Sequence, residues 1–202
     1  MKMKLLLSTL TCLTSTALFA ADSPPVGSAA PDFSVTDAKG KNQSLSQYKG
    51  KYVVLEWFNP DCPFVKKHYG GGNMQKLQQQ YTDKGVVWLS VDSSAPGKEG
   101  NLTPEQGEKK MAEWKTHSTA LLLDQDGKAG QAYGAKNTPH MFIINPEGKI
   151  IYAGAIDSKA TPNPADISSS TNYVKVALDE AMAGKPVTTP STRPYGCSVK
   201  YK

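Results

Sequence analysis

Cysteine and arginine are both scarce in this sequence, and each shortage restricts the functions that the chain can serve. The 202 residues include three cysteines and one arginine, Arg193, so the formal charge of +5 comes almost entirely from lysines. These lysines are scattered, and they form no basic stripe with interleaved aromatic residues of the kind that binds nucleic acids. We therefore expect no nucleic-acid partner.

Long apolar runs are also missing, which argues against a membrane-spanning protein. The run from Leu5 to Phe19 follows Lys2 and Lys4, contains serines and threonines, and is followed by small residues at 20 and 21. This order is the pattern of a cleaved secretory signal, whereas a span needs about 20 apolar residues. We expect residues 1–20 to be a signal peptide. The protein would then be exported, with the periplasm favoured, and would keep no stable membrane anchor after cleavage.

Cleavage of residues 1–20 would leave two cysteines, Cys62 and Cys197. Exported proteins meet an oxidising environment in which a disulfide persists, and two cysteines allow one intramolecular pairing. A bridge needs Cα atoms within about 7 Å, which the sequence does not show. Three readings therefore stay open: Cys197 resolves a reaction of Cys62, a permanent disulfide holds the C-terminal tail, or both thiols are free.

The rest of the chain divides into a flexible leader at 21–30, one folded domain at 31–184 and a proline-rich tail at 185–202. Apolar and β-branched runs predict the strands, while turn residues, prolines and glycines mark the helix ends. The predicted strands are 52–58, 86–91, 121–123, 141–145 and 149–154. The predicted helices are 62–69, 74–81, 103–115, 127–133 and 173–182. Strands that alternate with helices predict an α/β fold with a mixed central sheet covered by helices on both faces.

Cys62 stands where a buried strand gives way to a helix. Residues 52–58 are β-branched and aromatic, and Pro63 suits the first position of a helix. A helix N-terminus favours a negatively charged group, so it favours the reactive thiolate. Lys66 and Lys67 add positive charge one turn on, although the acidic residue before Cys62 opposes them. We predict that Cys62 is a nucleophile rather than a small buried core residue.

Glu56 is the charged residue on the otherwise apolar 52–58 strand. Burial raises the pKa of a carboxyl group, which would allow Glu56 to act as a general acid or base near neutral pH. The alternative is a solvated position at the edge of the sheet.

Four motifs follow one another along the chain. They are the leader and turn over 27–41, the strand–Cys–Pro–helix corner at 52–69, the segment Asn137–Thr138–Pro139–His140 and the ending 194–200. Together they resemble redoxin-type, AhpC/TSA-like proteins of the thioredoxin fold. The resemblance implies a thiol–disulfide oxidoreductase that acts on protein or small-molecule thiols and disulfides, without a cofactor.

The resemblance also assigns roles to individual residues. It makes Glu56 a proton relay to the active-site sulfur, and it makes Thr138–Pro139 a cis peptide beside that sulfur which presents backbone for pairing with a substrate. Pro63, Phe64 and Thr138 would contribute to the substrate-binding surface. The chain departs from the dithiol pattern because Val65 stands where the second active-site cysteine would be.

Two other functions remain open. A thiol peroxidase would pass through a sulfenic acid on Cys62, but peroxiredoxins carry a proline and a threonine or serine where this chain has Leu55 and Asn59. A permanent bond between Cys62 and Cys197 would instead leave a non-catalytic binding module.

The histidines do not predict a metal site. His68, His117 and His140 are dispersed along the sequence, and we expect all three at the surface. Copper-binding relatives of this fold need a second cysteine four residues after the first, where this chain has Lys66.

Overall fold

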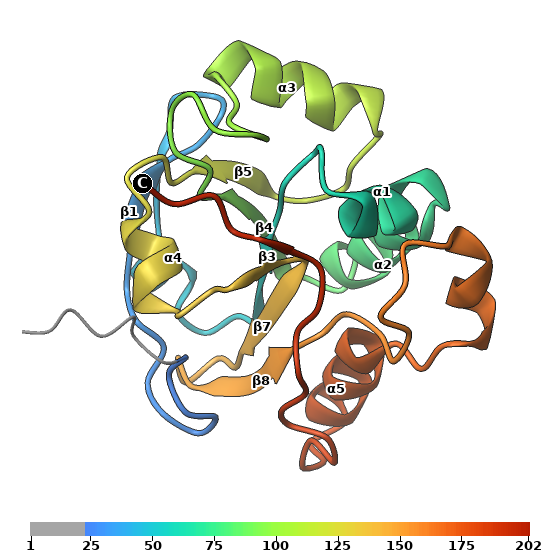
Figure 1. The fold of residues 1–202 in the computed structure, drawn as a ribbon. Coiled ribbons are helices and arrows are strands. Elements are labelled where there is room, and N and C mark those ends of the chain that lie inside the picture. Colours follow the sequence, from blue (N-terminus) through green and yellow to red (C-terminus); the bar gives the residue numbers. More distant parts are fainter. Residues whose placement is uncertain (1–22) are drawn as a thin grey trace, which may run out of the picture.

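A five-stranded mixed sheet forms the centre of the structure, a computed structural model that describes residues 23–202 (Figure 1). Its strand order is β5, β4, β3, β7, β8. The central strand β3 (Val53–Trp57) runs parallel to β4 (Val87–Asp92) and antiparallel to β7 (His140–Ile144). The edges are β5 (Ala120–Leu123) and β8 (Ile150–Gly154). Every residue of β3, β4 and β7 is buried, as expected of strands covered on both faces.

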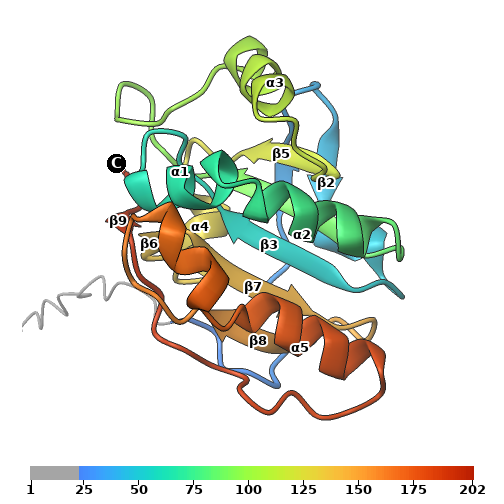
Figure 2. The same ribbon diagram turned by 90° about the vertical axis from the view of Figure 1, so that its right-hand side faces the viewer.

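Helices lie on both faces of this sheet, which confirms the predicted architecture. The helices are α1 (Pro63–Gly70), α2 (Asn73–Thr82), α3 (Pro104–Glu113), α4 (Lys128–Ala132) and α5 (Tyr173–Met182). Figure 2 shows α1, α2 and α5 over one face, with α4 behind the sheet and α3 near β5.

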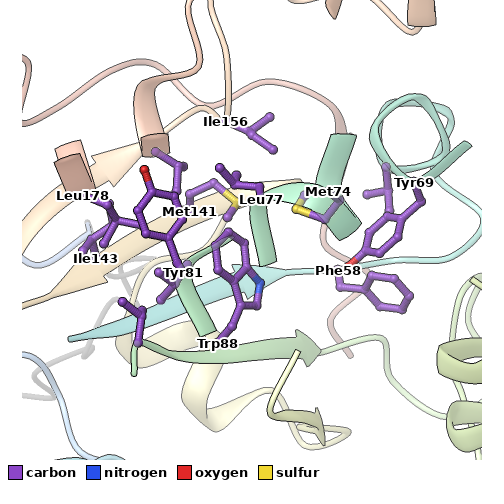
Figure 3. Packing of buried hydrophobic residues seen from close by; sticks show 14 of the residues in the cluster. Phe58, Tyr69, Met74, Leu77, Tyr81, Trp88, Met141, Ile143, Ile156 and Leu178 are labelled. Carbon is purple, nitrogen blue, oxygen red and sulfur yellow. The ribbon is translucent and has the colours of Figure 1, made fainter. Parts of the chain in front are cut away.

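Large aromatic and aliphatic side chains fill the layer between the sheet and helices α1, α2 and α5 (Figure 3). Trp88 of β4 and Tyr81 of α2 are fully buried there. The rings of Phe58 and Tyr69 meet edge to face with centroids 5.7 Å apart, a favourable geometry for aromatic pairs. This packing fixes α1 against the end of β3, where Cys62 lies.

The predicted helix ends follow from local sequence. Gly72 has a φ of 68° and separates α1 from α2, as expected from the three glycines at 70–72. Thr103 and Gln106 form a reciprocal capping box at the start of α3, which satisfies two backbone amides that a helix leaves unpaired.

Two short antiparallel pairs lie outside the main sheet. One joins β1 (Ser34–Thr36) to β2 (Asn42–Ser44), and the other joins β6 (Asn137–Thr138) to β9 (Cys197–Ser198). The sequence pattern did not predict β2, β6 or β9. The tail crosses the front of the molecule in Figure 1, and β9 brings it to the segment before β7.

The leader differs from expectation in its described part. Gly27 and Ala30 donate backbone hydrogen bonds to Ile150 and Gly148, and Ile150 donates one to Ser28. This pairing at the β7–β8 hairpin holds residues 27–30 in place, so the flexible leader predicted for 21–30 does not extend over them. The predicted signal peptide lies outside the described residues. Within residues 23–202, no helix is both long enough and apolar enough to cross a membrane.

Candidate active site

Cys62 occupies the N-cap of α1, immediately before Pro63 at the first helical position. This is the strand-to-helix corner that the sequence predicted. The side chain of Cys62 is fully buried, and its thiol donates a hydrogen bond to the carbonyl oxygen of Thr138 at 3.0 Å. The sulfur is therefore held at the start of a helix and beside the segment that leads into β7.

The segment beside the sulfur contains the predicted cis peptide bond, between Thr138 and Pro139. Thr138 also lies directly opposite Cys197 in the β6–β9 pair. The structure therefore brings together Cys62, Thr138, Pro139 and Cys197, although Cys197 comes from the far end of the chain.

The two thiols are unbonded and differ in their ease of ionisation. Burial raises the pKa of the Cys62 thiol, but the neighbouring Cys197, Thr138 and backbone amides together outweigh it, so the pKa lies below the ordinary value. Burial, together with the neighbouring Cys62, raises the pKa of Cys197 to about 12. The Cys62 thiol therefore ionises more readily than the Cys197 thiol.

The two lysines expected to favour the thiolate are committed elsewhere. Lys66 is exposed and its ammonium lies 3.8 Å from Asp61. Lys67 is fully buried, with its ammonium 3.0 Å from Asp157 and 2.8 Å from the carbonyl oxygen of Lys159. The predicted electrostatic role of Lys67 toward Cys62 is therefore replaced by a buried ion pair.

Glu56 is fully buried, as predicted. Its carboxylate accepts hydrogen bonds from Tyr69 at 2.9 Å, Gln78 at 3.2 Å, Trp88 at 2.8 Å and Ser90 at 3.3 Å. Burial raises the pKa of Glu56 to about 7, against the opposing effect of these donors. None of its hydrogen bonds leads to a sulfur, so the structure places a titratable group in the same core without a direct contact to Cys62.

A buried polar group that sequence reasoning missed lies beside the active-site helix. We call it the tyrosine cluster, and it consists of Lys67, His68, Asp157 and Tyr195. The Tyr195 hydroxyl donates to one oxygen of Asp157, while the other oxygen faces Lys67 at 3.0 Å. His68 Nε2 lies 3.3 Å from the Tyr195 hydroxyl. No local pattern marks this cluster, because its members come from three distant parts of the chain.

The surface predicted to bind substrate is covered by the tail. The ring of Phe64, next to the exposed Pro63, lies 5.7 Å from that of Tyr195. A side chain on Gly196 would clash with the carbonyl oxygen of Thr138, which shows how closely the tail approaches β6. Phe64 and Thr138 therefore contact residues 195–197 of the same chain.

Two of the three histidines are buried, which corrects the expectation that all lie at the surface. His68 accepts a hydrogen bond from Asn73 at 2.9 Å, and His140 packs on Phe142 with ring centroids 4.5 Å apart. Burial lowers the pKa of His68 to about 4 and that of His140 to about 3. His117 is exposed, as predicted. Residues 23–202 contain no group of three side chains suited to hold a metal ion.

Comparison with known proteins connects this geometry to a family. The chain is 29% identical to the thiol-disulfide oxidoreductase ResA of Bacillus thuringiensis subsp. konkukian over 126 residues. The aligned residues make up 62% of this chain and 67% of that protein. An uncharacterized conserved protein of Geobacillus kaustophilus superposes with a TM-score of 0.78 at 28% identity, covering 88% of this chain and 93% of that chain.

The fold is also that of a thioredoxin domain. The thioredoxin domain of a thiol-disulfide oxidoreductase from Bacteroides vulgatus matches with a TM-score of 0.53 at 25% identity, over 73% of this chain and 98% of that domain. The predicted thioredoxin-like fold is confirmed. A sequence model of the AhpC/TSA family matches residues 26–153, which is more than half of the chain. The protein therefore belongs to the AhpC/TSA family.

Proposed function

We propose that the protein is a thiol–disulfide oxidoreductase in which Cys62 is the nucleophile and Cys197 the resolving thiol. One observation carries this proposal: Cys197 lies directly opposite Thr138 in the β6–β9 pair, and the carbonyl oxygen of Thr138 accepts the hydrogen bond of the Cys62 thiol at the start of α1. Homology to ResA supports the reaction class. The partners would be protein or small-molecule disulfides.

The proposed reaction has two exchange steps. The Cys62 thiolate attacks one sulfur of a partner disulfide, forming a mixed disulfide and releasing the other partner sulfur as a thiolate. The Cys197 thiolate then attacks the Cys62 sulfur, which forms the Cys62–Cys197 disulfide and releases the second partner thiolate. Two electrons pass to the partner disulfide, and the two released thiolates take up protons. The same steps in reverse oxidise a partner dithiol.

The first step prepares the second. In the resting site, the negative charge of Cys62 helps to raise the pKa of Cys197. When Cys62 enters a mixed disulfide, that charge disappears, so Cys197 ionises more easily at the moment when it must attack.

Glu56 and the tail complete the proposed mechanism. The pKa of Glu56, about 7, suits a group that takes up and returns a proton near neutral pH, although an intermediary would have to carry the proton to the sulfur. Pro63, Phe64 and Thr138 are the proposed contact surface for the partner. Because Cys62 is fully buried, the tail must move away before the partner reaches it.

We propose that the reaction takes place after export, in the periplasm. The support is the basic, apolar and small-residue order of residues 1–20, which is typical of a secretory signal. Expression with a C-terminal tag, followed by cell fractionation and mass determination of the mature N-terminus, tests this. A full-length protein in the cytoplasmic fraction would contradict it.

Reaction with oxidised glutathione, followed by mass spectrometry, tests the chemistry. We expect the wild-type protein to form a Cys62–Cys197 disulfide with release of reduced glutathione. Cys197→Ser should stop at a glutathione adduct on Cys62, and Cys62→Ser should form neither product. Equal adducts in the wild type and in Cys197→Ser would remove Cys197 from the mechanism.

Two further measurements on the wild-type protein distinguish thiol–disulfide exchange from a structural disulfide and from a peroxidase. A Cys62–Cys197 reduction potential near about −200 mV indicates exchange, whereas one below about −300 mV indicates a structural bond. A peroxidase would instead form a sulfenic acid on Cys62 rapidly when hydrogen peroxide is added. The structure provides no hydroxyl at position 59, where the Asn59 side chain bonds to the backbone of Asp61 and Glu99.

A further inference from the structure

Tyr195 lies two residues before Cys197, and its hydroxyl is fixed inside the protein. The hydroxyl donates to the carboxylate of Asp157 and lies 3.3 Å from His68 Nε2. His68 Nδ1 faces the side-chain amide of Asn73 at 2.9 Å. Because burial holds His68 neutral with a pKa of about 4, Nδ1 accepts from Asn73 and Nε2–H donates to Tyr195. A chain of hydrogen bonds thus runs from Asn73 through His68 to Tyr195 of the tail.

The ring of Tyr195 is held as well as its hydroxyl. One contact is with the ring of Phe64, with centroids 5.7 Å apart. The other is with the Lys67 ammonium, which lies 5.6 Å from the ring centroid, within the range of a cation–π interaction. Phe64, Lys67 and His68 all belong to α1, the helix that begins at Cys62. Tyr195 therefore attaches the tail to the same helix that carries the nucleophile.

The residue between Tyr195 and Cys197 transmits this position to the thiol. Gly196 has a φ of 118°, a region that residues with side chains rarely adopt, and its carbonyl oxygen accepts a hydrogen bond from the Asn137 side chain at 3.0 Å. With Tyr195 anchored and Gly196 pressed against β6, Cys197 is placed opposite Thr138.

Asp157 stabilises Tyr195 in its bound position. Its carboxylate is buried and accepts from the Lys67 ammonium at 3.0 Å, from the Lys159 amide at 3.0 Å and from Tyr195. A buried ion pair is stable only while its hydrogen-bonding capacity is satisfied. Departure of Tyr195 would leave Asp157 short of a partner, so the cluster favours the seated tail.

We propose that Tyr195 is a positioning residue for the exchange between Cys62 and Cys197: its contacts with the tyrosine cluster and Phe64 seat Cys197 against the Cys62 sulfur and close that sulfur to partners. This inference rests on the proposed function. It has a distinctive consequence, because one contact controls two properties in opposite directions. Loosening Tyr195 slows the internal reaction of Cys197 and speeds the approach of external reagents to Cys62.

The test compares Tyr195→Phe with Tyr52→Phe. Tyr52 is also partly buried and donates its hydroxyl to a backbone oxygen, that of Ala181 at 2.9 Å, but it contacts neither cysteine. The first measurement is the equilibrium of the Cys62–Cys197 disulfide in glutathione buffers, which gives the effective concentration of Cys197. We expect Tyr195→Phe to lower it about tenfold, since the lost hydrogen bond has a charged acceptor. Tyr52→Phe should leave it unchanged.

The second measurement is the alkylation rate of Cys62 by iodoacetamide in a Cys197→Ser background, followed by mass spectrometry of the Cys62 peptide. Adding Tyr195→Phe should raise this rate about tenfold, and adding Tyr52→Phe should not. A drop in effective concentration without faster alkylation, or no change in either, would overturn the positioning role. If the wild type forms no Cys62–Cys197 disulfide, the proposed function fails and the positioning role with it, whatever the alkylation rates are.

Discussion

Thr138 lies directly opposite Cys197 in the β6–β9 pair, and its carbonyl oxygen accepts the hydrogen bond of the Cys62 thiol. Thr138 thus contacts both Cys62 and the strand that carries Cys197. The edge of β6 beside the cis peptide, which the family resemblance assigned to substrate pairing, is occupied by the tail of the same chain. Access to Cys62 and the position of Cys197 are therefore coupled.

This coupling predicts that Gly196→Ala exposes Cys62. A side chain at position 196 would clash with the Thr138 carbonyl oxygen. The φ of 118° at this position also strains any residue other than glycine, at a cost of about 1–3 kcal/mol. Detachment of β9 should then become about ten- to a hundredfold more frequent. In a Cys197→Ser background, we expect alkylation of Cys62 to accelerate by a similar factor.

Gly148→Ala is the matched control for this experiment. Gly148 has a φ of 77°, but nothing lies within 4 Å of the position that its side chain would take. Gly148→Ala therefore places a side chain at a positive φ without the clash, at the β7–β8 hairpin. Equal acceleration in both variants would show that general destabilisation, rather than release of β9, exposes Cys62.

The buried ion pair between Lys67 and Asp157 predicts a large loss of stability in Lys67→Met. Both side chains are almost completely buried, so removal of the lysine leaves a carboxylate without its charged partner in the interior. Breaking such a pair costs about 3–5 kcal/mol. Urea denaturation should show this loss in the free energy of unfolding.

Lys66→Met is the control for the ion pair, because Lys66 neighbours Lys67 and its own partner Asp61 is exposed. Exposed pairs contribute about 0–1 kcal/mol. Similar losses in the two variants would contradict a special role of the buried pair.

The raised pKa of Glu56 predicts how stability depends on pH. Its pKa is about 7 in the folded protein and 4.5 as the reference value. The folded state therefore binds the Glu56 proton more tightly than the unfolded state does. This stabilising contribution to the free energy of unfolding is fully present below about pH 4.5 and is lost as the pH rises through 7. The loss is on the order of 3 kcal/mol.

Glu56→Gln isolates this contribution, since glutamine has the same shape but does not ionise, and its Oε1 can still accept from Gln78, Trp88 and Ser90. We expect the free energy of unfolding of the wild type, relative to this variant, to decrease from pH 5 to pH 8 in urea titrations. His68 and His140 act in the opposite sense, because their lowered pKa values destabilise the folded state as the pH falls below 6.5. Both histidines titrate in the wild type and in the variant, so their effects cancel when the two free energies of unfolding are subtracted. A difference independent of pH would refute the assignment.

Sequence reasoning found those parts of the site that local pattern determines. The apolar run before Cys62 and Pro63 after it were sufficient to predict the strand, the helix start and the position of the sulfur between them. Glu56 was predicted to be buried because its neighbours on β3 are apolar. The cis bond at Thr138–Pro139 came from the resemblance to a family.

The parts that were missed depend on contacts between distant segments. Lys67 and Asp157 are separated by 90 positions in sequence, and a buried lysine on α1 has the same local sequence appearance as an exposed one. The path of the tail depends on β9, a strand of only two residues. Its extended structure is set by pairing with the distant β6 rather than by its own sequence. The burial of His68 followed from that path, because Tyr195 covers it.

The lowered pKa of Cys62 beside Cys197 predicts that Cys197→Ala raises the pKa of Cys62. Burial of Cys62 opposes ionisation, and the Cys197 thiol is the strongest of the groups that overcome it. Without that thiol, the thiolate fraction of Cys62 at neutral pH should decrease. Thiolate absorbance at 240 nm, titrated from pH 4 to 11 in reduced protein prepared without residues 1–20, measures this directly, with Ser198→Ala as a neighbouring control.

The reciprocal variant completes the argument. In Cys62→Ala, Cys197 loses both the charged neighbour and the acceptor that help to raise its pKa to about 12, so its titration should move to lower pH. Opposite movements of the two single-cysteine proteins would demonstrate that the thiols share a proton. If each thiol instead titrates alone at the pH it shows in the wild type, the two sulfurs do not interact, and Cys197 has no basis as the resolving thiol.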